Sequence, residues 1–175
     1  MTSLAEMYSS MNGLLDWLRG TRPLGAAAEE RAFPVYDGGF LRLSVPPRWN
    51  EEFHIAGERC SLVFRAAARA AVALRIETSA LSVQESLSYS VEDMRKEVEV
   101  AARAASASSI EVFAGRHGGG FHFSSMEAGS GWRLLQGRFL ARPVLLDFRM
   151  AWTGRSGWLA RAALELVRTA RASAD

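Results

Sequence analysis

The sequence predicts an α+β domain in which an antiparallel β-sheet of about six to seven strands is flanked by helices. Two observations carry this prediction. Runs with period-two alternation, which is typical of strands, fall into two groups, and a long run with helical spacing separates the groups. The turns within the second group are short, so its neighbouring strands are expected to pair antiparallel.

The first 30 residues are predicted to form an amphipathic helix and a linker. Between residues 3 and 19, apolar side chains recur at helical spacing, and Gly20 is expected to end the helix. Pro23, Gly25 and a run of alanines mark the linker. The segment from Met1 to Gly20 could therefore lie against its own domain, against a partner protein or against a sister subunit in a homo-oligomer. A single α+β domain is expected over residues 31–175.

Three strands are predicted in the first half of this domain. Residues 40–45 alternate apolar and polar side chains, and Pro46 and Pro47 end the run. Two further short runs, at residues 59–64 and 71–77, are separated by a small loop. They predict a β-hairpin.

A long helix is predicted next. Ser82 followed by Glu85 is a capping box, in which the two side chains satisfy each other's backbone amides at a helix start. Charged residues fall mostly on the other faces, so the helix is expected to cover the core along one side. The apolar stripe consists of residues at steps of three and four: Val83, Leu87, Val91, Met94, Val98, Ala101 and Ala105.

In the second half of the domain, the sequence pattern predicts four strands and a final helix. The triple glycine at 118–120 and the Gly-Ser-Gly at 129–131 are expected to be turns. Gly154 and Ser156 are expected to open the last helix. The four strands are predicted at residues 110–114, 121–126, 132–140 and 144–152.

No catalytic or metal-binding motif stands out. His54, His117 and His122 lack the spacing of a zinc site, and the triple glycine is followed by strand-like residues instead of the Lys-Ser/Thr of a P-loop. Cys60 is the only cysteine, which excludes an intramolecular disulfide, and in its apolar strand it is expected to be a buried structural thiol. We therefore expect no enzyme activity, no metal and no cofactor.

Charge and hydropathy exclude other classes of protein. The 21 basic and 19 acidic residues are intermixed, which argues against a nucleic-acid-binding surface. The glutamate pairs Glu29-Glu30 and Glu51-Glu52 are expected in solvated loops. No window approaches 18 uncharged apolar residues, so no transmembrane helix is predicted, and the N-terminus lacks the pattern of a secretory signal. The expected location is the cytoplasm.

Polar side chains inside two otherwise apolar strands supply the candidate partner-binding residues. Gln136 and Arg138 lie in one strand, and Asp147, Arg149 and Trp152 lie in the next. One interpretation is a half-solvated sheet face on which Asp147 and Arg149 pair with strand neighbours. The other is a sheet surface that receives a partner, with an aromatic anchor at the strand end.

The run from Phe40 to Trp49, with its strand, double proline and tryptophan, resembles the opening of the Mog1/PsbP-like superfamily. This superfamily includes the DcrB-like proteins and the chaperones of type VI secretion effectors. The hairpin, the capped long helix and the strand that leads into a C-terminal helix are similar too, over roughly residues 35–171. The resemblance implies a non-enzymatic adaptor, chaperone or assembly factor whose partner is a protein, such as a secreted effector or a membrane-complex component.

Two hypotheses of function remain open. The leading one is a non-enzymatic protein-binding module, such as an adaptor, a chaperone or a secretion-system accessory protein. The alternative is a small-molecule-binding protein or an atypical enzyme with a pocket between the long helix and the sheet. A deep cavity that contains His122 or Cys60 beside an acid would favour the alternative.

Overall fold

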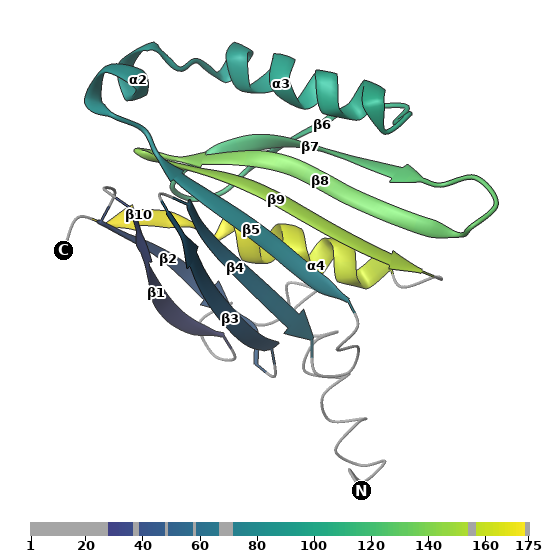
Figure 1. The fold of residues 1–175 in the computed structure, drawn as a ribbon, viewed down its shortest axis with the longest axis horizontal. Helices are drawn as coiled ribbons and strands as arrows, with labels where there is room; N and C mark the ends of the chain where they lie inside the picture. Colours follow the sequence, from purple (N-terminus) through teal and green to yellow (C-terminus); the bar gives the residue numbers. More distant parts are fainter. Residues whose placement is uncertain are drawn as a thin grey trace, which may run out of the picture.

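The protein has a mixed α+β fold built on two antiparallel sheets (Figure 1). The computed structural model describes residues 28–36, 39–47, 49–57, 59–66, 72–153 and 157–173. The predicted helix at residues 1–20 lies outside these residues. None of the described helices is long and apolar enough to cross a membrane.

The larger sheet has seven strands in the order β3-β4-β5-β9-β8-β7-β6, and every neighbouring pair is antiparallel. The predicted hairpin is confirmed as β4 and β5, and the four predicted strands of the second half are confirmed as β6 to β9. In chain order the strands are β3 (Trp49–Ala56), β4 (Arg59–Ala66), β5 (Ala73–Ala80), β6 (Glu111–Ala114), β7 (Gly119–Met126), β8 (Trp132–Ala141) and β9 (Val144–Thr153).

The smaller sheet has three strands, in the order β1-β2-β10. Only β2 (Gly39–Val45) was expected from the sequence; β1 (Glu29–Val35) and β10 (Arg171–Ser173) join it from the two ends of the domain. β1 accommodates Pro34 because it is an edge strand, where a missing backbone N–H costs no ladder bond. The expectation that the two glutamate pairs lie in loops is wrong, since one pair begins β1 and the other lies within β3.

The expectation of a single long helix after Ser82 is wrong in one respect. The chain forms two helices, α2 (Val83–Ser88) and α3 (Val91–Ala104). The capping box of Ser82 and Glu85 is present at the start of α2. A second capping box, between Ser90 and Asp93, begins α3 and satisfies the backbone amides that a continuous helix would use.

The break changes which side chains are buried. Val83 and Leu87, predicted to face the core, are 82% and 84% exposed, and Val91 is exposed as well. Met94 and Val98 are buried as expected, together with Ala102. The apolar stripe therefore covers the sheet only from Met94 onwards.

The seven-stranded sheet separates two layers (Figure 1). We call the face toward α4 (Gly157–Arg168) and the smaller sheet the inner face, and the face toward α3 the outer face. The main core lies on the inner face. On β9 it contains the residues of the predicted alternation, namely Val144, Leu146, Phe148, Met150 and Trp152.

The triple glycine is only partly a turn, because Gly119 and Gly120 belong to β7. A Cβ on Gly120 would lie 1.9 Å from the carbonyl oxygen of Arg138 on β8. Glycine is therefore required for close packing within the sheet rather than for flexibility. The second predicted turn is confirmed, with Gly129 and Gly131 both at positive φ.

Candidate functional site

Helix α3 covers only one part of the outer face. Its buried residues Met94, Val98 and Ala102 pack on apolar side chains of β7 and β8 and on Leu145 at the start of β9. Farther along the sheet, Arg75 and Glu77 of β5 and Arg149 of β9 are exposed. We call this uncovered part, formed by β5 and the middle of β9, the open face.

The structure separates the five candidate partner-binding residues. Gln136 lies opposite Arg149, and Arg138 lies opposite Asp147, in the ladder between β8 and β9. These four share the outer face, because strand neighbours in register point the same way. Trp152 belongs to the inner-face core and is only 3% exposed. The five residues therefore do not form one surface.

The Arg138 side chain links α3 to the sheet through polar contacts. Its Nε lies 2.5 Å from Asp147 Oδ1, and its Nη1 contacts both Glu97 of α3 and the hydroxyl oxygen of Tyr89. The Tyr89 hydroxyl in turn donates a 2.6 Å hydrogen bond to Glu97 Oε2. Asp147 thus pairs with a strand neighbour, as the interpretation of a paired sheet face expects, whereas Arg149 forms no ion pair among the described residues.

Burial shapes the titration of this cluster. Burial, together with the hydrogen bond to Glu97, raises the pKa of the Tyr89 hydroxyl to about 12. Burial also raises the pKa of the Asp147 carboxyl, and the neighbouring Arg138 opposes that rise. Tyr89 is therefore a neutral hydrogen-bond donor at physiological pH, which suits a structural link better than acid–base chemistry.

Two arginines face each other on the open face. Arg75 of β5 lies directly opposite Arg149 of β9, and Gln136 of β8 continues the same row. Neither arginine has an ion-pair partner among the described residues. Like charges directly opposite across a ladder destabilise a sheet. The open face therefore carries two cations that form no ion pair among the described residues, with the exposed Glu77 at the next position of β5 on the same face.

The residues with catalytic potential lie apart from the open face. His122 is 6% exposed, and its Nε2 lies 3.8 Å from Glu111 Oε2. Burial lowers the pKa of His122, whereas Glu111 raises it. Cys60 is buried in β4, as predicted. Within the described part of the chain, no group of three His, Cys, Asp or Glu side chains could hold a metal ion.

Two hollows flank the end of the β7–β8 hairpin. One, of about 440 Å³, lies beside α4, and its lining includes Arg133, Trp152 and Ala160. The other, of about 510 Å³, lies beside the end of α3 and includes Trp132 and Ala151. Neither hollow is lined by His122 or Cys60.

Arg133 was missed as a candidate, although a signal for it was present in the sequence. It shares its period-two phase with Leu135 and Phe139 on β8, and both of those residues are buried in the inner-face core. An arginine in the inward phase of an apolar strand is a polar exception, and such exceptions point to sites.

The two sheets and the helices that flank them define a protein of the PsbP-like fold. A solution structure of cyanobacterial PsbP (CyanoP) from Synechocystis sp. PCC 6803 is similar, with a TM-score of 0.53 and 13% identity, over 85% of this chain and 94% of that one. This likeness confirms at the level of fold the resemblance found in the sequence.

A crystal structure of a protein from Bacteroides thetaiotaomicron VPI-5482 is similar as well, with a TM-score of 0.54 and 14% identity. The match covers 77% of this chain and spans 46% of the Bacteroides chain. No protein-family model and no curated protein matches the sequence. At these identities the likeness extends to the fold alone.

Proposed function

We propose that the protein is a non-enzymatic binding module that docks an acidic segment of a partner protein on its open face. The observation that carries this proposal is the pair Arg75 and Arg149, which face each other without an ion-pair partner among the described residues. An adaptor, a chaperone or a secretion-system accessory protein would use such a surface. The sequence resemblance favours a secreted effector or a membrane-complex component as the partner.

The charge of this surface suits an acidic partner. Two guanidinium groups held side by side repel each other, and this chain places no carboxylate between them in the described residues. A partner carboxylate that reached both would turn the repulsion into charge-assisted hydrogen bonds, for which the planar guanidinium is well suited. Gln136 extends the row and could donate or accept a further hydrogen bond.

The test compares three forms of the tagged full-length chain in pull-downs from native lysate of the source organism. The Arg75→Ser/Arg149→Ser variant removes the cation pair, and Arg116→Ser/Arg161→Ser removes two exposed arginines elsewhere, for a matched loss of charge. We expect wild type and control to retain the same partner and the open-face variant to bind it at least about tenfold more weakly, since two charge-assisted contacts are lost.

Binding should also weaken with added salt in the wild type more than in the open-face variant, because exposed charges are screened. Equal retention of the partner by the open-face variant would refute the docking surface. Failure of the wild type to retain any saturable partner would refute the binding function itself.

A further inference from the structure

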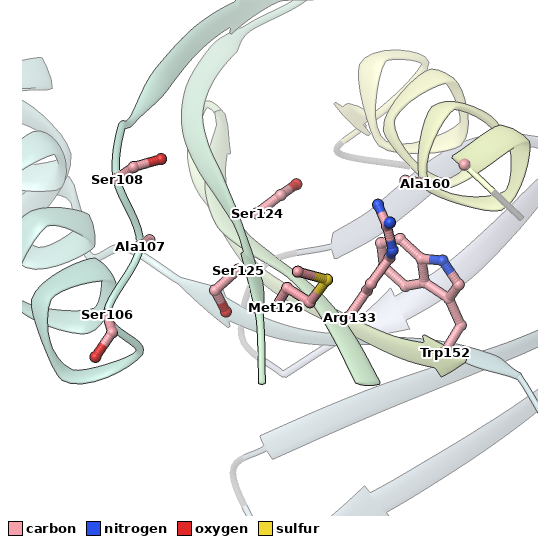
Figure 2. A pocket seen from close by; sticks show the side chains of 10 residues that line it. Ser106, Ala107, Ser108, Ser124, Ser125, Met126, Arg133, Trp152 and Ala160 are labelled. Atoms are coloured by element: carbon pink, nitrogen blue, oxygen red, sulfur yellow. The ribbon is translucent and has the colours of Figure 1, made fainter. Parts of the chain in front are cut away.

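The hollow beside α4 is rich in hydrogen-bond donors (Figure 2). It lies where β7 ends, β8 begins and α4 starts, and the loop after α3 closes one side. Among the described residues that line it, none is acidic. They are Ser106, Ala107, Ser108, Ser124, Ser125, Met126, Arg133, Trp152, Gly157 and Ala160.

Three of these side chains form a row across the sheet. Met126 of β7 lies opposite Arg133 of β8, and Arg133 lies opposite Trp152 of β9. Side chains that are directly opposite in an antiparallel ladder have Cβ atoms about 4.5–5.5 Å apart and point to the same face. Figure 2 shows the Arg133 and Trp152 side chains next to each other, with Ala160 of α4 above them in this view.

Trp152 contributes a buried donor without a partner. The residue is almost completely buried, and its Nε1 makes no hydrogen bond among the described residues. The indole N–H can only donate, and a buried donor without an acceptor is costly. A ligand oxygen in the hollow would satisfy it.

Arg133 contributes the only cation among the described residues of the lining. It is exposed, and among the described residues its side chain forms neither a hydrogen bond nor an ion pair. Gly157, at the start of the 12-residue helix α4, also lines the hollow. The partial positive charge of a helix N-terminus therefore acts in the same direction as Arg133.

We propose that this hollow binds a small organic acid through a single carboxylate, with an apolar tail. Arg133 pairs with the carboxylate, and Trp152 Nε1 and the Ser124 hydroxyl donate hydrogen bonds to its oxygens. Met126, Ala107 and Ala160 accommodate the tail. The single guanidinium among the described lining residues matches one negative charge, whereas phosphate groups usually recruit more cations. The volume falls in the range of small-ligand pockets.

Ligand binding in this hollow is independent of the protein-docking function. The hollow lies between the loop after α3 and the start of α4, at the ends of β7 to β9, and its lining includes neither Arg75 nor Arg149. Loss of one function therefore leaves the other testable.

The experiment uses octanoate as the probe and octanamide as its uncharged counterpart, with the full-length protein. Calorimetric titration should detect saturable binding of octanoate and none of octanamide. Arg133→Met should weaken octanoate binding about tenfold or more, since a charge-assisted contact is lost, while Arg149→Met on the opposite face should leave it unchanged. Arg133 is exposed, so its replacement should not prevent folding.

A second measurement locates the ligand. The indole Nε1–H resonance of Trp152, assigned through Trp152→Phe, should shift on addition of octanoate in proportion to the bound fraction. Equal affinity for octanamide, or unchanged octanoate affinity in Arg133→Met, would overturn the proposal. Tighter binding of inorganic phosphate than of octanoate would overturn the carboxylate assignment.

Discussion

The inner and outer faces of the seven-stranded sheet differ along a single strand. On β9, Phe148 is buried in the core, while its neighbour Arg149 is exposed on the open face. The inner face is covered by α4 and the smaller sheet, whereas α3 covers only part of the outer face. The inner face therefore contributes most to the free energy of folding, whereas the exposed charges of the open face do not stabilise the fold.

The largest effect is expected for Phe148→Ala. Phe148 packs against the ring of Phe113 at 5.7 Å between centroids and lies opposite Ile76 and Gly137. Removal of a buried phenyl ring leaves a cavity and should lower the free energy of unfolding by about 3–5 kcal/mol, measured by urea denaturation.

The adjacent variant, Arg149→Ala, is the matched control on the other face. Its side chain is exposed and repelled by Arg75, so the free energy of unfolding should stay within about 0.5 kcal/mol of wild type. A loss from Arg149→Ala as large as that from Phe148→Ala would show that the faces are not energetically distinct.

A smaller loss of stability is expected where α3 covers the outer face. Met94 of α3 is buried against Leu140 and Leu145, and Met94→Ala should lower the free energy of unfolding by about 2–3 kcal/mol. Val91, on the same helix, is 58% exposed, so Val91→Ala should change it by less than about 0.5 kcal/mol. Equal losses in thermal or urea unfolding would mean that α3 does not pack as described.

Period-two alternation made the inner face predictable. The strands from β6 to β9 and the apolar row of β9 follow directly from it, because each alternate residue there enters one continuous core. β1, β3 and β10 were not predictable in this way. β10 has only three residues, and β1 and β3 lie at sheet edges, where one glutamate pair begins β1 and another lies inside β3.

The candidate site was less predictable than the fold, since it depends on contacts between distant segments. The sequence placed Gln136, Arg138, Asp147 and Arg149 in adjacent strands, and their cross-strand pairs follow from register. It could not show that Glu97 and Tyr89 would engage Arg138, because the break before α3 determines where those side chains lie. Arg75 joined the site only through the pairing of β5 with β9.

His122 is a polar exception on the inner side of the sheet, and it predicts a dependence of stability on pH. Burial holds the pKa of its imidazole below the usual 6.5, and nearby Arg168 acts in the same direction, while Glu111 opposes them. The unfolded chain therefore binds a proton near pH 6.5 that the folded protein takes up only at lower pH. Stability is full above the unfolded pKa and falls as the pH drops toward the folded pKa.

One proton limits the His122 contribution to about 1.4 kcal/mol per pH unit. His122→Gln should remove this contribution, so the difference in unfolding free energy between variant and wild type should change between pH 7.5 and pH 5. His117→Gln, at an exposed turn, should keep the wild-type slope. If His122→Gln kept that slope too, the imidazole would be titrating as freely when folded as when unfolded. The inner side of the sheet would then admit solvent at this position, and the contrast between the two faces would not extend to β7.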